Sequence, residues 1–178
     1  MRKVVLAMQM SLDGYVAGPA SQLDWMWPTF TPEMKADIVE AIRRTSTQLM
    51  GRVTYEAQSA HWPDSTDEIA PLVNDAEKIV FSQTLSEPLS WSGARLATAD
   101  LATVIQRLRR TAGGDIALVG GSVLARAAIG VRLVDEYQLI VHPVTLGEGL
   151  PLFDAPVSLH LRDHRIYSSG AMRLTYSS

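Results

Sequence analysis

The sequence predicts an α/β fold in which a mixed, mainly parallel sheet lies between two layers of helices and ends in antiparallel C-terminal strands. Two observations predict it. Before Asp135, short apolar runs alternate with segments whose apolar residues recur every three or four positions, as in strands that alternate with amphipathic helices. After Asp135, strand-like segments follow one another with short connections and no helix between them, which is typical of antiparallel strands.

The first elements can be placed from their apolar runs and caps. Val4 to Met8 is a continuous apolar run that ends before Asp13-Gly14 and suits a central strand buried on both faces. A helix follows, with Thr31 as its N-cap and Pro32 in its first turn, where the missing N–H costs nothing. Its apolar stripe, at four-residue spacing, consists of Met34, Ile38 and Ile42.

The later elements follow from the same signals. Leu49-Met50 is a short strand that meets Gly51, and a short helix is expected from Thr54. Asp100 begins a helix that ends before Gly113-Gly114. The remaining expected strands are 78–81, 116–119, 137–146, 157–167 and 171–176, a further helix is 122–129, and 63–71 and 86–93 are expected to be loops.

Composition narrows the class of protein. The chain has 178 residues, 47% of them apolar, a formal charge of −3 and no cysteine. These values fit one domain over residues 1–178, without a disulfide framework or a thiolate metal site. The small negative charge offers no sustained attraction to a nucleic acid, and no stretch approaches the length of a membrane span. We therefore expect a cytoplasmic protein whose partner is a small molecule, not a nucleic acid or a membrane.

Gly120-Gly121-Ser122 lies between a predicted strand and a predicted helix. Glycines permit close backbone approach there, and the free N–H groups of a helix start favour an anion, so this turn is a candidate phosphate site. A tight turn that needs glycine only for packing is an equal alternative. The alternating glycines of a Rossmann dinucleotide site and the Gly-Lys-Ser/Thr ending of a phosphate loop are both absent.

Two further turns follow predicted strands. Gly51-Arg52-Val53-Thr54 adds a guanidinium that can grip a phosphate in a bidentate manner, although a capped turn with a surface arginine is equally compatible with it. Ser82-Gln83 supplies a hydroxyl and an amide after a third strand, and taken alone it resembles an ordinary polar turn.

Together these segments resemble the RibD C-terminal-domain family, whose members are relatives of dihydrofolate reductase. The resemblance rests on the order and intervals of 11–17, 49–56, 79–82, 118–122 and 134–136, continued by His142-Pro143 to Gly147 and the final strands. It implies a dihydrofolate-reductase-like, three-layer α/β/α fold that binds NADPH, and it implies a homodimer.

The resemblance also implies which residues contact the cofactor. The nicotinamide would be bordered by Gln9, Val16 and Ala17, and the adenosine 2′-phosphate by Ser82 and Gln83. The phosphates would lie near Gly51, Arg52, Val53 and Thr54, and the pyrophosphate near Val119, Gly120, Gly121, Ser122, Val123 and Leu124. Arg52 would then favour NADPH over NADH.

Candidates for chemistry and substrate binding are fewer. Asp13 and Asp37 are the carboxylates to consider as proton donors or substrate anchors, against the alternatives of a turn aspartate and a solvated helix-boundary aspartate. Trp25 and Trp27 would wall a pocket for a planar heterocycle or cap the core beneath a loop. No metal site is expected, because a strand would hold His160 and His164 too far apart for one ion.

The predicted function is an NADPH-dependent reductase that transfers hydride to a C=N or C=O bond of a small heterocycle or sugar derivative. The resemblance relates it to 5-amino-6-(5-phosphoribosylamino)uracil reductase, whose substrate glutamate is replaced here by Val119. This difference keeps two alternatives open, a non-catalytic NADP-binding protein and a dihydrofolate reductase.

Overall fold

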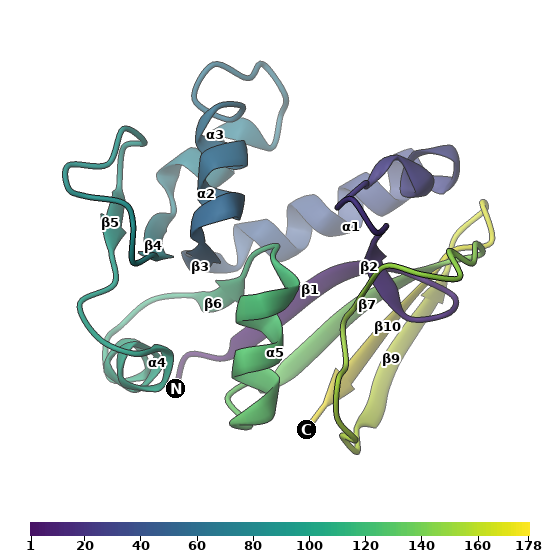
Figure 1. The fold of residues 1–178 in the computed structure, drawn as a ribbon. Helices are drawn as coiled ribbons and strands as arrows, with labels where there is room; N and C mark the ends of the chain where they lie inside the picture. Colours follow the sequence, from purple (N-terminus) through teal and green to yellow (C-terminus); the bar gives the residue numbers. More distant parts are fainter.

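The computed structural model describes residues 1–178 and contains an eight-stranded sheet with helices on both faces (Figure 1). The strand order is β5-β4-β3-β6-β1-β7-β10-β9, and a separate two-stranded sheet pairs β2 with β8. The strands from β5 to β7 in this order are parallel to their neighbours, whereas β10 is antiparallel to both β7 and β9. The predicted fold class is confirmed.

The bounds of the elements are as follows. The strands are β1 (Val4–Ser11), β2 (Tyr15–Ala17), β3 (Thr45–Gly51), β4 (Glu77–Phe81), β5 (Ala94–Leu96), β6 (Asp115–Leu118), β7 (Glu136–His142), β8 (Leu150–Pro151), β9 (His160–Ile166) and β10 (Met172–Ser177). The helices are η1 (Asp24–Thr29, 3-10), α1 (Pro32–Arg43), α2 (Arg52–Ser59), α3 (Ala70–Asp75), α4 (Leu101–Arg109) and α5 (Ser122–Gly130). None of these helices combines the length and the apolar character needed to cross a bilayer.

The two faces of the sheet are covered differently (Figure 1). Helices α4 and α5 cover one face and close the largest apolar core, in which alternate strand residues such as Leu6, Leu49 and Leu118 are almost fully buried. Helix α1 covers the other face, beside α2 and α3, over the smaller clusters around Met50 and Met34. The two helical layers of the predicted α/β/α arrangement are therefore present, one on each face of the sheet.

The predicted N-cap Thr31 is confirmed, and Asp100, predicted to begin a helix, is the N-cap of α4. The side chain of Thr31 accepts a hydrogen bond from the backbone N–H of Met34 at 3.2 Å, and Asp100 accepts one from Thr103 at 2.9 Å. Pro32 occupies the first turn of α1, as expected. These local signals place the starts of α1 and α4 correctly.

Several predicted boundaries are wrong for identifiable reasons. Strand β7 ends at His142 and not at residue 146, because Pro143 has no N–H and Val144 turns back to donate to the carbonyl of His142 at 2.8 Å. Helix α2 begins directly after Gly51, two residues before Thr54. Helix α3 begins at Ala70, inside the segment 63–71 that was expected to be a loop. Strand β3, expected only at Leu49-Met50, is seven residues long.

The expectation that β1 is buried on both faces holds from Val4 to Leu6 and fails at Ala7. Val4 and Leu6 face the closed core, but Ala7 on the opposite face is exposed. Ile38 and Ile42, which were assigned to the apolar stripe of α1, are only partly buried, whereas Met34 is fully buried. Helix α1 therefore packs most tightly near its N-terminus, and further along it packs against the cluster around Met50 with a cleft beside it.

Truncating side chains on α1 would test this difference in packing along the helix. Met34 packs against Ile140, Tyr167 and Ala171, so we expect Met34→Ala to lower the free energy of unfolding by about 2–5 kcal/mol. Ile38 is only partly buried and lines the cleft, so Ile38→Ala should cost less than half as much. Urea unfolding measures both values, and equal losses would contradict the open face of the sheet.

Candidate functional site

The predicted cofactor residues lie in a row along one edge of the sheet. Strands β4, β3, β6 and β1 are neighbours in that order and are parallel, so their carboxyl ends point the same way. The segments that follow them are Ser82-Gln83, Gly51 to Thr54, Val119 to Leu124 and, within the end of β1, Gln9. In open α/β sheets, ligands bind at this edge.

The two glycine turns approach each other closely. Gly120 and Gly121 have φ angles of 55° and 68°, a region that side-chain-bearing residues rarely adopt. A Cβ atom on Gly120 would lie 2.9 Å from Cγ2 of Thr54, and one on Gly121 would lie 3.2 Å from Oγ1 of Thr54. Both glycines are therefore required for the turn after β6 to lie against the start of α2.

This approach brings two helix N-termini together. Gly51 and Gly121 are the N-caps of α2 and α5, and neither helix has a side chain that caps its first N–H groups. These N–H groups and the positive ends of the two helix dipoles can accept an anion. Next to them, Val53 and Val123 in the first turns are 69% and 75% exposed.

The polar side chains along the edge have local partners. Arg52 donates to both carboxylate oxygens of Glu56, at 3.0 and 2.8 Å, one turn along α2. Ser82 accepts from the backbone N–H groups of Thr84 and Leu85 at 3.1 and 3.0 Å, and its oxygen lies 3.4 Å from the hydroxyl oxygen of Thr84. To bind a phosphate, Arg52 would have to release its hydrogen bonds to Glu56.

Gln9 is held by a buried histidine. His142 is fully buried and lies 2.6 Å from Oε1 of Gln9 through Nε2, and 2.6 Å from the hydroxyl of Thr29 through Nδ1. Because an amide oxygen only accepts, a neutral ring carries its proton on Nε2, and Thr29 then donates to Nδ1 in place of the carbonyl of Met26 at 3.2 Å. Burial lowers the pKa of His142, which agrees with the neutral ring.

The tryptophans lie on η1, beside this histidine. Trp25 makes an edge-on contact with His142, with 5.5 Å between ring centroids, and Trp27 is 58% exposed and contacts Phe30. Trp25 thus belongs to the shell behind Gln9, while Trp27 presents its ring to solvent. Val16 and Ala17, on β2, are both buried, so a ligand would meet their backbone and not their side chains.

Asp13 joins two loops. Its carboxylate accepts from the hydroxyl of Ser11 at 2.6 Å and from the backbone N–H of Gly147 at 2.8 Å and of Leu146 at 3.1 Å. The hydroxyl of Ser11, assisted by these N–H groups, lowers the pKa of Asp13. Asp13 therefore remains ionised and ties the β1–β2 turn to the loop after β7.

A cleft of about 240 Å³ lies between α1 and the open face of the sheet. Gln9, Val119 and Gly120 line it, so it adjoins the glycine turns. Its other walls come from α1, α2 and α3, from strands β1, β3, β6, β7 and β10, and from the segment after α2. They include Ala7, Asp37, Ile38, Ile42, Gln48, Gln58, Trp62, Gln138 and Arg173. More than half of the lining residues are apolar, as is usual for a small-molecule site.

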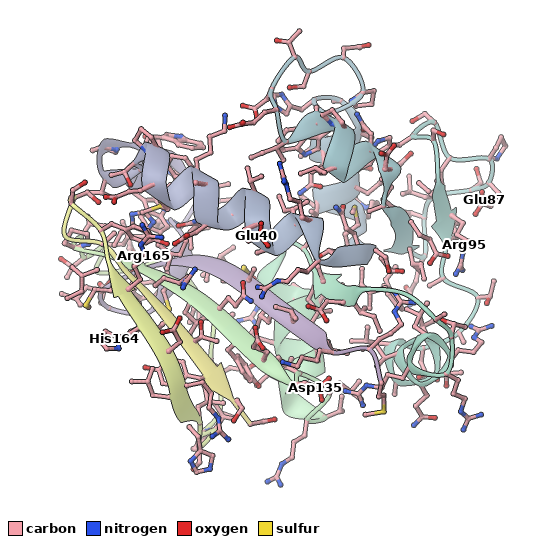
Figure 2. The ribbon with its side chains drawn as sticks, turned by 180° about the vertical axis from the view of Figure 1, so that it is seen from behind. Glu40, Glu87, Arg95, Asp135, His164 and Arg165 are labelled. Carbon is pink, nitrogen blue, oxygen red and sulfur yellow. The ribbon has the colours of Figure 1, made fainter.

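Asp37 lines this cleft and is not a solvated boundary residue. Its side chain is 16% exposed and accepts from Arg165 at 2.7 Å, from Tyr167 at 2.8 Å and from Arg173 at 3.1 Å. Burial and the hydrogen bond to Asp37 raise the pKa of Tyr167, which keeps its phenol protonated as a donor. Figure 2 shows Arg165 where the end of β9 meets α1.

Sequence reasoning missed several residues that the structure places in the cleft. Gln48, Gln58, Trp62 and Arg173 all line it, and none belongs to a recognised motif. A polar Gln48 beside Leu49-Met50 in a buried strand was the one available signal. Nothing in the local sequence marks Arg173, because its partners come from α1 and β9.

Comparison with known structures defines the class of fold. A protein from Shewanella sp. PV-4 named for riboflavin biosynthesis superposes with a TM-score of 0.81 over 98% of both chains, at 23% identity. Dihydrofolate reductase from Enterococcus faecalis, complexed with NADP(H), superposes with a TM-score of 0.66 over 98% of this chain and 95% of the other, at 14% identity. The fold is therefore dihydrofolate-reductase-like.

Sequence comparison defines the family. The model of the RibD C-terminal domain matches residues 2–173, so the chain belongs to the RibD C-terminal domain family. The uncharacterized protein YyaP of Bacillus subtilis (strain 168) is 31% identical, over 98% of this chain and 94% of its own length. The resemblance inferred from the motifs is confirmed.

The neutral His142 predicts a pH dependence of stability. Its pKa is lowered in the folded state, so the unfolded chain takes up a proton first, and stability should fall as pH drops below about 6.5, by at most about 1.4 kcal/mol per pH unit. Urea unfolding between pH 8 and 5 measures this slope. His142→Gln should remove it, and a slope that persists in that variant would contradict a neutral buried His142.

The contacts of Asp37 predict a loss of stability on neutralisation. Asp37→Asn leaves Arg165 and Arg173 without their shared carboxylate, and we expect the free energy of unfolding to fall by about 1–3 kcal/mol. Asp163→Asn is the matched control, because Asp163 is 60% exposed and contacts only Arg173 at 3.0 Å. Thermal unfolding measures both variants, and equal stability of Asp37→Asn and Asp163→Asn would contradict the role of Asp37 in holding the two arginines.

Proposed function

We propose that the protein is an NADPH-dependent reductase that transfers hydride to a C=N or C=O bond of a small heterocycle or sugar derivative. The contact of Gly120 with Thr54 carries the proposal, because it brings two uncapped helix N-termini together at the edge of a cleft. Membership of the RibD C-terminal domain family supports it.

The residues present fit this cofactor. A Cβ atom at Gly120 would intrude on Thr54, so the turn stays open only with glycine, and the N–H groups that begin α2 and α5 are free to hold phosphates. Arg52 and Ser82, at the ends of neighbouring strands, would hold the 2′-phosphate. When bound, NADPH supplies the hydride.

The cleft would hold the hydride acceptor. Gln9 and Gly120 belong to both the cofactor edge and the cleft, so a substrate there would lie against the nicotinamide that Gln9 borders. With a substrate bound, the apolar walls, including Ala7 and Ile38, would exclude water from the reacting atoms. Of the two candidate carboxylates, only Asp37 lines the cleft, and we assign it the role of orienting Arg173 beside the substrate.

Thermal shift tests cofactor binding directly. A ligand that binds only the native state raises the unfolding temperature, so NADPH should raise it more than NADH at equal concentration. Arg52→Ala should weaken NADPH binding about tenfold or more and leave NADH binding unchanged, because the guanidinium reads the extra phosphate. Arg43→Ala, at the exposed end of α1, is the control.

The outcomes separate the candidate functions. The absence of any NADPH effect on the wild-type chain would overturn the proposal, and an unchanged preference in Arg52→Ala would remove the role of Arg52. NADPH binding without oxidation across pteridine, pyrimidine and carbonyl substrates would favour a binding protein without turnover. Steady NADPH oxidation with one of them would establish a reductase.

A further inference from the structure

A second cavity opens at the other end of the parallel strands. It has a volume of about 540 Å³ and lies where β3 and β4 begin, beside the C-terminal half of α4 and the segment that follows it. The glycine turns follow the carboxyl ends of the same sheet, so its length separates them from this cavity. We call the cavity the arginine pocket, because Arg2, Arg95 and Arg107 line it.

Arg2 brings a buried positive charge to the arginine pocket, since it is only 7% exposed. Its guanidinium donates to the hydroxyls of Ser46, Thr47 and Thr111, at 2.9, 2.6 and 3.2 Å, and to the carbonyl of Gly114 at 2.8 Å. All four acceptors are uncharged. A buried charge that meets only neutral acceptors is costly unless an anion lies within reach, so Arg2 favours an anion in the pocket.

Glu77 is the one carboxylate that lines the pocket, and both of its oxygens already have partners. Oε1 accepts from Nε and Nη2 of Arg95 at 3.1 and 2.8 Å, and Oε2 accepts from Thr47 at 3.1 Å. Asp115, the other carboxylate that acts on Arg2, lines the cleft under α1 instead. Three guanidinium groups therefore share one carboxylate in the lining, which leaves two positive charges unmatched.

Arg95 and Arg107 are the charged groups that a ligand can reach. The side chain of Arg95 is 44% exposed, at the sheet edge formed by β5 (Figure 2), and Arg107 is exposed in the last turn of α4. Arg107 makes one hydrogen bond, to the hydroxyl of Thr98 at 3.3 Å. Nη1 of Arg95 and both Nε and Nη1 of Arg107 are free donors.

The walls around these groups admit an anion. A Cβ atom on Gly113 would lie 2.9 Å from Oγ of Ser46 and 3.1 Å from Cζ of Arg2, so glycine allows the chain to pass close to the guanidinium. The C-terminal end of α4 is the negative end of its dipole, which disfavours an anion. Arg107 and Arg109 in its last turn offset that effect.

These features select the chemical class of the ligand. Two unmatched positive charges and free N–H donors favour a ligand with two negative charges and several acceptor oxygens. The apolar part of the lining is small, namely Val104, Leu108 and Ala112, so the pocket offers no apolar wall to a planar heterocycle. A phosphate group carries nearly two charges at neutral pH and binds guanidinium groups in a bidentate manner.

We propose that the arginine pocket is a second ligand site, which binds the phosphate group of a small, polar phosphorylated compound through Arg95 and Arg107. Arg2 supplies a fixed positive charge to the same site. The pocket shares no lining residue with the cleft under α1 and lies away from the glycine turns. This inference therefore stands independently of the proposed function.

Chemical shifts of the ¹⁵N-labelled full chain locate the bound probe. The probe is glycerol 3-phosphate, with glycerol and acetate as controls at the same ionic strength. Glycerol 3-phosphate should shift the backbone amides of Ser46, Thr111 and Gly113 in a saturable way, acetate should bind at least tenfold more weakly, and glycerol should not bind. The absence of saturable shifts at these residues, or equal binding of acetate, would overturn the proposal.

Substitutions test the two accessible arginines. Arg107→Gln and Arg95→Gln should each raise the Kd for glycerol 3-phosphate about tenfold, because each removes charge-assisted hydrogen bonds. Arg110→Gln is the matched control, since Arg110 is also exposed at the end of α4 but does not line the pocket. All three positions are exposed, so the variants should keep the unfolding temperature of the wild type. Equal affinities of Arg107→Gln and Arg110→Gln would overturn the proposal.

NADPH distinguishes the arginine pocket from the proposed cofactor edge. Glycerol 3-phosphate should still bind when NADPH is saturating, and Arg52→Ala should keep the wild-type affinity for it. Displacement of the probe by NADPH, with shifts at Gly51 and Gly120 instead, would place it at the cofactor edge and overturn the second site. Probe binding that depends on Arg107 in a chain that does not bind NADPH would support the pocket and overturn only the reductase.

Discussion

The close approach of Gly120 to Thr54 is the contact on which the rest of the site depends. It follows from the parallel pairing of β3 with β6, in which the N–H of Val119 donates to the carbonyl of Leu49 at 2.9 Å. Because of this pairing, β3 and β6 end next to each other at the same end of the sheet. The helices that follow them, α2 and α5, therefore start side by side. A side chain at Gly120 would separate them and would disrupt the site proposed for the cofactor phosphates.

The two faces of the sheet are packed differently. The face under α4 and α5 is closed, with residues such as Ile105 and Ile116 fully buried. On the other face α1 contacts the sheet through Met34 and is tied through Asp37 to the β9–β10 hairpin. Further along the same helix a cleft remains beside the cluster around Met50.

The two aspartates considered for catalysis serve different purposes. Asp13 binds Ser11 and the backbone after β7, and so supports the loop above β1, outside the cleft. Asp37 does line the cleft, where it orients one phenol and two guanidinium groups. Their chemical roles, like the homodimer and the cytoplasmic location, stay predictions. Spacing along the sequence could not separate them, because each is a carboxylate beside an apolar segment.

The sequence by itself determined the features that depend on near neighbours. The caps Thr31 and Asp100, the glycine turns and the change of pattern at Asp135 are of this kind, because each involves hydrogen bonds or periodicity within a few residues. Only the tertiary structure decided that Asp37 meets Arg165, 128 residues away, and that Gln48 lines a cleft. Such contacts depend on strand order and on where α1 leaves the sheet, which no local pattern encodes.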